Sequence, residues 1–243
     1  MEAIRPSHYS GIRRIGMHIL AMVEFTSMFA ARRFWRCPPS ALAAWGDGST
    51  GSPQGGNDCS GTITAVTGSP GNFTVSGSNV DGNSGDGVLL QAGSSATFEG
   101  NTISANAGPG VEIQTANSVY LGGNIVSGNA PDILVDGAGG DSVTGADTAE
   151  VIDVQSANNV LTGGPGANTY ALGPNSGQNT ITNFNVSADV LDLRQTAVGS
   201  WTFSSLVITQ VGNDTFIGLG GSAGITLSGV NASTLCANNF IFD

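Results

Sequence analysis

The strongest constraint on the fold is a 23-residue repeat in the middle of the chain. From Phe73 to about Val135 the sequence fits three successive copies in one register. The positions that coincide are Ser78, Asn101 and Asn124; Asn83, Asn106 and Asn129; Phe73, Ala96 and Val119; Val75, Phe98 and Leu121; Val80, Ile103 and Val126; and Val88 and Val111, followed by Ile133 or Leu134. A fixed period of this length indicates that one structural unit is stacked on the next.

Within each copy the apolar residues alternate with polar or small ones, as in Ala96-Thr97-Phe98. A period of two is typical of a strand with one buried face. Short strands separated by Gly and Asn turns bury their inward side chains only by stacking coil on coil, so we expect a solenoid. The recurring Asn residues fit such coils, because a ladder of amides can hydrogen-bond from one coil to the next.

These repeats, exemplified by NTISANAGPGVEIQTANSVYLGGNIVSGNA, resemble the right-handed parallel β-helix repeats of pectate-lyase-like and alginate-epimerase-like proteins. The resemblance covers about residues 70–135 and implies an architecture rather than an activity. We therefore expect an all-β fold, a right-handed parallel β-helix or β-roll solenoid that ends in a C-terminal β-rich cap.

The repeat length then changes to nine residues, with apolar residues at Val143, Ile152, Leu161 and Tyr170. The first unit, DGAGGDSVT, and the fourth, GGPGANTYA, resemble the calcium-binding nonapeptide G-G-x-G-x-D-x-U-x. Such turns need Gly for positive φ and for exposed carbonyls, and calcium prefers oxygen ligands. In the family that these units resemble, two nonapeptides form one coil of a β-roll, and calcium lies between turns of neighbouring coils.

The resemblance implies a set of candidate calcium ligands in these turns: Asp136, Gly137, Gly139, Asp141, Glu150, Asn159, Gly164, Gly166 and Asn168. A coil of two nonapeptides would pair Asp141 with Asn159 and Glu150 with Asn168, which leaves one carboxylate in each pair. Fewer carboxylates weaken calcium binding. Two interpretations stay open, namely weak calcium sites and structural turns descended from calcium sites.

The C-terminal residues contain NTITNFNVSADVLDLRQ, then GITLSGV, and end on NFIFD. In this order the elements resemble the C-terminal region of repeats-in-toxin proteins, which are exported by type I secretion. The resemblance implies a secreted, extracellular protein with the type I secretion apparatus as a partner. Phe240 and Phe242 would belong to the export signal, to the inward side of a last strand, or to both.

Five segments are expected along the chain. They are an atypical N-terminal segment, helical or disordered (1–45), a Gly/Ser-rich linker (46–71), parallel β-helix coils (72–135), a nonapeptide β-roll (136–171) and a C-terminal β-rich secretion-type region (172–243). The first segment is read either as an unusual export signal or as an incorrectly assigned start. Glu24 lies in its apolar stretch, which argues against stable membrane insertion.

Charge restricts the partners. From Ala41 onward there are 16 acidic residues and one basic residue, Arg194, which gives a formal charge of 1 − 16 = −15. Nucleic acid is therefore not expected as a partner, because phosphate recognition depends on Lys and Arg. Hydrated cations are favoured. The three cysteines, Cys37, Cys59 and Cys236, have a spacing that indicates neither a disulfide framework nor a zinc site.

Catalytic side chains are scarce. The chain has no Lys, and its two histidines, His8 and His18, lie in the N-terminal segment. Glu99 with Glu112 or Asp132 could supply paired carboxylates, but each occupies a single coil position, so a solvated face is the preferred interpretation. The expected function is a secreted, non-catalytic, calcium-binding or structural module of a type I secreted, polysaccharide-associated protein. The alternative is a remnant of a polysaccharide lyase or mannuronan-epimerase-like enzyme.

Overall fold

The computed structural model describes residues 42–44, 58–59, 63–66, 72–91, 95–114, 118–196 and 201–242. The chain divides into two compact units, residues 1–33 and 34–243, and every described residue belongs to the second. The expectations for the residues before Leu42 therefore lie outside the described residues.

Three sheets, named A, B and C here, contain the strands. Sheet A consists, in spatial order, of β1 (Leu42–Ala44), β3 (Ile63–Val66), β6 (Val88–Gln91), β9 (Val111–Ile113), β12 (Ile133–Val135), β14 (Val151–Val154), β16 (Thr169–Leu172), β18 (Val190–Asp192) and β22 (Phe240–Ile241). Sheet B consists of β4 (Asn72–Ser76), β7 (Ser95–Glu99), β10 (Ser118–Tyr120), β13 (Ser142–Thr144), β15 (Val160–Thr162), β17 (Gln178–Ile181), β21 (Gly224–Leu227), β20 (Asp214–Gly218) and β19 (Val207–Val211). Sheet C consists of β11 (Ile125–Ser127), β8 (Thr102–Ser104), β5 (Asn79–Asp81) and β2 (Asp58–Cys59).

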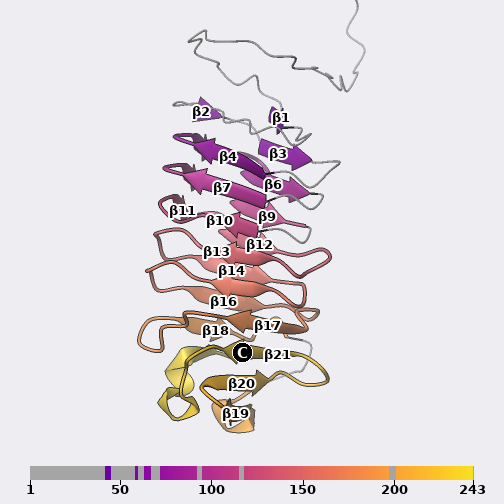
Figure 1. Cartoon of the computed structure of the whole chain (residues 1–243), viewed down its shortest axis with the longest axis vertical. Coiled ribbons are helices and arrows are strands. Elements are labelled where there is room, and N and C mark those ends of the chain that lie inside the picture. Colours follow the sequence, from indigo (N-terminus) through magenta and orange to yellow (C-terminus); the bar gives the residue numbers. More distant parts are fainter. Residues whose placement is uncertain are drawn as a thin grey trace, which may run out of the picture. The chain divides into compact units, whose positions relative to one another are not determined.

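Successive coils stack in sequence order, and nearly all neighbouring strands are parallel (Figure 1). The register predicted from the repeat is confirmed in all three sheets. Phe73 pairs with Ala96 in sheet B and Val80 pairs with Ile103 in sheet C. Val88 pairs with Val111 in sheet A, and the next residue in that column is Ile133 rather than Leu134. The expected all-β parallel solenoid is therefore the observed fold.

Parallel pairing begins before residue 72. Strands β1, β2 and β3 fall within the segments expected to be an atypical start and a linker, and they pair with one another or with strands of the regular coils. The stack of parallel strands therefore begins within these two segments.

The coil shortens from three strands to two in the nonapeptide region. Val143 and Leu161 lie in sheet B and pair with each other, while Ile152 and Tyr170 pair in sheet A. Two nonapeptides therefore make one coil, as predicted. Sheets A and B run without a break from the longer coils into the shorter ones.

A threonine hydroxyl marks the end of sheet C. The Oγ1 atom of Thr148 accepts a hydrogen bond from the Val126 N–H at 3.3 Å and donates one to the Val126 carbonyl at 2.9 Å. These two backbone groups of β11 would otherwise be available to a further parallel strand. The Thr148 side chain thus satisfies the Val126 N–H and C=O groups of β11 at the point where the coil changes from three strands to two.

Buried asparagines form ladders inside the longer coils. The Ser78 N–H donates to Asn101 Oδ1 at 2.9 Å, and the Asn101 N–H donates to Asn124 Oδ1 at 2.8 Å. In the second column the N–H groups of Asn83 and Asn106 donate to the amide oxygen one coil further on, each at 3.1 Å. The ladders satisfy backbone groups at turns where no strand pairing is available.

The C-terminal cap ends both sheets. Strand β21 joins β17 in parallel, whereas β20 and β19 turn back and pair antiparallel in sheet B. Strand β22 closes sheet A, and its Phe240 is buried and stacks on Phe242 with ring centroids 5.8 Å apart. Three short 3₁₀ helices complete the cap: η1 (Phe203–Ser205), η2 (Ala232–Thr234) and η3 (Ala237–Asn239).

Candidate metal site in the nonapeptide turns

The expected ligand pairs do lie in neighbouring coils. Asp141 and Asn159 immediately precede strands of sheet B, and Glu150 and Asn168 immediately precede strands of sheet A. All four side chains are buried. The predicted pairing of these positions is confirmed, and their binding of calcium stays a prediction.

In the first pair, the amide is used as a coil-to-coil acceptor. The Asp141 N–H donates to Asn159 Oδ1 at 2.9 Å, and the Asn159 N–H donates to Asn179 Oδ1 at 2.8 Å. The Asn159 Nδ2 group donates to the Ser156 carbonyl at 2.9 Å. This column therefore continues the arrangement of the asparagine ladders, with an aspartate at its first position.

The second pair has the same backbone contact. The Glu150 N–H donates to Asn168 Oδ1 at 3.2 Å, and the Asn168 N–H donates to Asp189 Oδ1 at 2.8 Å. The Asn168 Nδ2 group donates to the carbonyls of Gly164, at 3.0 Å, and Gly166, at 3.3 Å. Asp189 thus extends the column, although sequence reasoning placed it only in the C-terminal pattern.

The Glu150 carboxyl group differs from the amides in this column. Its Oε1 atom accepts from the Ala146 N–H at 2.6 Å, whereas its Oε2 atom is buried with no hydrogen-bond partner. Burial, with smaller contributions from the charges of Asp132 and Asp147, raises the pKa of Glu150 to about 7, although the hydrogen bond from the Ala146 N–H acts in the opposite direction. Oε2 is therefore an oxygen that requires either a proton or a cation near neutral pH.

The glycines of these turns serve two purposes. Gly137 and Gly139 have φ values of 79° and 74°, as the nonapeptide pattern predicted. Gly164 and Gly166 do not have positive φ, so that expectation is wrong for them. A Cβ on Gly164 would overlap the Ala146 carbonyl oxygen, so these glycines allow the turns of successive coils to approach each other closely.

Asp136, the first residue of the predicted ligand set, has a different environment. It is half-buried, and its pKa is raised first by burial and then by the charges of Glu112 and Asp153. Glu112 and Asp153 occupy outward positions of β9 and β14 in sheet A. Asp136 is therefore close enough to the carboxylates on the outer side of sheet A for their charges to raise its pKa.

The donor set around Glu150 fits a hard cation. Calcium is held by carboxylate, amide and backbone carbonyl oxygens, and the turns at 145–150 and 163–168 supply all three types. One carboxylate per pair gives little charge, which predicts weak affinity. Within the described ranges, no group of three or more His, Cys, Asp and Glu side chains is placed to hold a metal ion.

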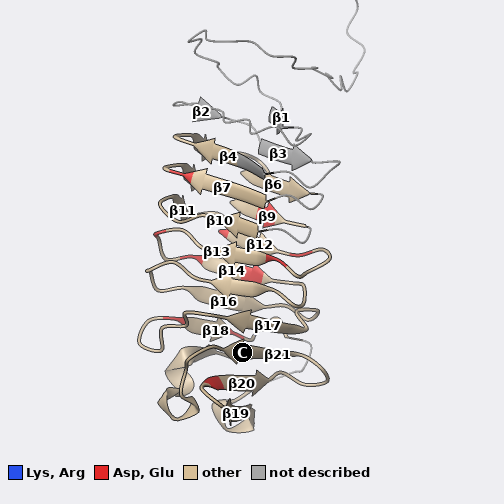
Figure 2. Cartoon of the chain, in the orientation of Figure 1, with Lys and Arg blue, Asp and Glu red and all other residues tan. Residues whose placement is uncertain are grey.

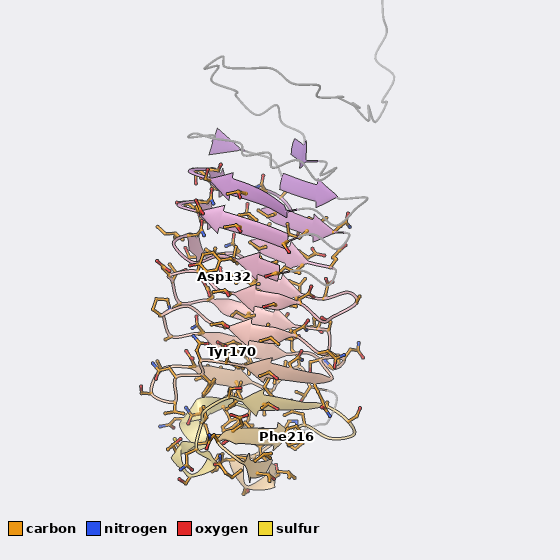
Figure 3. All side chains as sticks on the ribbon, viewed as in Figure 1. Asp132, Tyr170 and Phe216 are labelled. Carbon is orange, nitrogen blue, oxygen red and sulfur yellow. The ribbon has the colours of Figure 1, made fainter. Side chains whose placement is uncertain are left out.

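A carboxyl pair that the repeat analysis did not identify involves the same acidic side of sheet A. Asp86 and Glu112 hydrogen-bond through their side chains, and the pKa of Asp86 is raised to about 6 by burial, by that bond and by the charge of Glu112. Glu99, the candidate partner of Glu112 in the sequence, lies on β7 of sheet B, whereas Glu112 lies on β9 of sheet A. Asp132, which is labelled in Figure 3, is buried. Its carboxylate accepts hydrogen bonds from the N–H groups of Asn129 and Val151.

A family comparison agrees with this architecture. The model of the family described as "Right handed beta helix region" matches residues 63–241. This chain belongs to the right-handed β-helix family. Acidic residues of this β-helix are spread over several coils rather than gathered at one place (Figure 2).

Comparisons with individual proteins add less. No curated protein matches the β-helix chain. Among solved structures it is similar to the extracellular lipase LipA from Serratia marcescens, with 12% identity and a TM-score of 0.33. The similarity covers 76% of this chain and 40% of the lipase chain, so the β-helix spans less than half the length of that protein. Among the described residues, no helix is long and apolar enough to cross a membrane.

Proposed function

We propose that this β-helix is a non-catalytic structural module that binds calcium weakly between the turns at 145–150 and 163–168. The observation that carries the proposal is the buried Glu150 Oε2 atom, which has no hydrogen-bond partner and belongs to a carboxyl group with a pKa of about 7. A buried polar atom without a partner costs about 1 to 3 kcal/mol, and a cation bound at Oε2 would remove that cost.

Each residue of the turn pair has a part in the proposed site. Glu150 supplies the negative charge, and the Asn168 amide holds the two turns in register through the Glu150 N–H. The carbonyls of Gly164 and Gly166 lie on the same turn as Asn168 and are held by its Nδ2 group. Bound calcium would supply the positive charge that offsets the buried carboxylate and would join consecutive coils.

Calcium is expected to raise the melting temperature of the full chain at pH 8. A site with a dissociation constant of about 1 mM should add about 1.4 kcal/mol at about 10 mM calcium. Differential scanning calorimetry with chelator, calcium or magnesium measures this effect. The matched variant Glu99→Gln, at an exposed glutamate, should keep the response, and Glu150→Gln should lose it. An equal calcium response in Glu150→Gln would exclude this site.

We also propose that the module acts outside the cell as part of a polysaccharide-associated protein exported by the type I apparatus. The support is the C-terminal order of elements, with DVLDL before a GITLSGV strand and a terminal NFIFD, and the charge of −15 from Ala41 onward. A weak calcium site would then be filled only where calcium is abundant, as in extracellular modules.

The export proposal predicts a dependence on the secretion apparatus. The full chain, expressed in a bacterial host with and without a type I apparatus, should reach the culture medium only in the first strain. Quantitative immunoblotting of medium and cell fractions measures this, with a cytoplasmic protein as the control for lysis. Equal amounts in both media would exclude the route.

A further inference from the structure

The last strand of sheet B has properties that the calcium proposal does not use. Strand β19 is the end strand of the sheet, and among the described residues only β20 pairs with it. Its Val207 and Val211 are 63% and 58% exposed, the highest values among the exposed large apolar side chains of the described residues. Both valines lie on the same face of the strand, two residues on either side of Thr209.

The free edge of β19 is also unprotected. Natural proteins block such edges with charged residues, proline or bulges, because unpaired N–H and C=O groups attract another strand. The strand sequence VITQV contains none of these residues, and Figure 2 shows no charge on β19. The acidic residue nearest in the hairpin, Asp214, starts β20, where its carboxylate accepts the Gly229 N–H at 2.8 Å.

We propose that β19 is a dimerisation strand, and that a second copy of this chain pairs antiparallel with it across a two-fold axis at Thr209. The sequence is self-complementary about that residue. Val207 of one copy would lie opposite Val211 of the other on the exposed face, and Thr209 would lie opposite its own counterpart. Cross-strand pairs of β-branched residues and of threonines are both stabilising in antiparallel sheets.

The backbone geometry of the hairpin agrees with this register. Val211 pairs with Asp214 across a two-residue turn, so Val207, Thr209 and Val211 direct their N–H and C=O groups toward β20. Ile208 and Gln210 then direct theirs to the free edge. In the proposed pairing these two residues face each other and exchange both hydrogen bonds, while Thr209 and its counterpart form the closer, non-hydrogen-bonded pair.

The inward side chains of β19 make their contacts within the same copy of the chain. Ile208 packs against the core, and the Gln210 side chain donates to the carbonyls of Gly212 and Asp214 and accepts the Ala232 N–H. Phe216 on β20 is half-buried beside Thr209 in the register (Figure 3). Pairing would therefore continue the outer face of sheet B, from Phe216 through Thr209, into the sheet of the second copy.

The salt dependence of the proposed dimer should differ from that of a complex held together by opposite charges. Both copies are acidic, with a net charge of −11 each, so their long-range interaction is repulsive. Added salt screens that repulsion. Dimerisation through uncharged strands should therefore strengthen as ionic strength rises, whereas complexes held by opposite charges weaken.

Self-pairing at residue 209 allows a test by charge reversal. In the dimer, Thr209→Lys would place two lysines opposite each other, and Thr209→Glu would place two glutamates opposite each other. Each variant alone should dissociate at least 10-fold more readily than the wild type. An equimolar mixture of the two variants should form heterodimers with affinity restored to the wild-type range or above. Sedimentation velocity of the full chain over a concentration series measures all three cases.

The matched control is Val160→Lys, at an exposed valine on β15 in the middle of sheet B. It adds the same charge to the same sheet and should leave dimerisation unchanged. Far-ultraviolet circular dichroism checks that each variant is folded. A wild-type chain that stays monomeric at every concentration and salt level overturns the proposal. A dimer that tolerates both Thr209 variants, or a mixture that fails to associate, also overturns it.

Discussion

Replacing Asn124 with alanine should lower the free energy of unfolding by about 3 to 4 kcal/mol, because several buried polar groups would lose their partner. Asn124 is 1% exposed, and its Oδ1 accepts two hydrogen bonds from Asn101, both at 2.8 Å. Its Nδ2 group donates to the carbonyls of Phe98, at 2.7 Å, and Leu121, at 2.6 Å. Each of these groups that water cannot reach in the alanine variant costs about 1 to 3 kcal/mol.

Urea denaturation of the wild type and the variant measures the change. The control is Asn79→Ala, because among the described residues the Asn79 side chain makes one long contact, of 3.4 Å to Asp81, and it is less buried. That variant should lie within about 0.5 kcal/mol of the wild type. Equal effects of the two substitutions would mean that water or relaxation of the turn replaces the ladder, which would remove its structural role.

The ladders show how this solenoid makes its turns. Strands satisfy their backbone groups through neighbours in the same sheet, and several turn residues bond to the backbone of the next coil, but some N–H groups in the turns donate to a side chain instead. The acceptor is then a side-chain oxygen one coil further on, which Asn101 supplies for Ser78 and Asp189 supplies for Asn168. The same device operates in the longer and the shorter coils. Amide and carboxylate oxygens both serve as these acceptors, whereas the Glu150 Oε2 atom has no such hydrogen bond and requires a separate explanation.

This architecture could be predicted from the sequence because residues at equivalent positions of successive coils recur at a fixed spacing. Residues that pair between coils are separated by one period, so the columns of Val80 and Ile103 and of Val143 and Leu161 were visible before the structure. Each column keeps its chemical character, since the inward face of these coil strands is buried. The shortening of the coil in the nonapeptide region was visible for the same reason.

Features that occur once in the chain could not be predicted in this way. The Thr148 hydroxyl that ends sheet C has no counterpart in the neighbouring coils, and the pairing of Asp86 with Glu112 joins two unlike positions. Gly164 could be recognised as part of a motif, but the close carbonyl that requires it depends on how tightly two coils approach. Such contacts depend on distances that a periodic pattern does not contain.

Glu150 gives the second large predicted effect, a dependence of stability on pH. Its pKa rises from 4.5 to about 7 on folding, chiefly because of burial. Between these values the unfolded chain is ionised and the folded chain keeps its proton, so the free energy of unfolding falls as pH rises from about 4.5 to 7. A shift of this size corresponds to roughly 3 kcal/mol, at about 1.4 kcal/mol for each unit.

Glu150→Gln should therefore be more stable than the wild type at pH 8 by up to about 3 kcal/mol and close to it at pH 4. Glutamine resembles the protonated acid, since it can still accept the Ala146 N–H and carries no charge. Urea denaturation in chelator across this pH range measures the difference, with Glu99→Gln as the matched control. Asp86, Asp136 and Asp153 also have raised pKa values, so part of the slope should remain in the variant.

The pH profile also separates the two interpretations of the nonapeptide turns. If calcium replaces the proton on Glu150, calcium should stabilise the wild type at pH 8 and have little effect at pH 5, where the carboxyl group is protonated. If the turns are purely structural, the pH slope should persist and calcium should not change it at any pH. In that case the ionised Glu150 lowers the free energy of unfolding near neutral pH without binding a cation, and its unpaired Oε2 atom no longer supports a metal site.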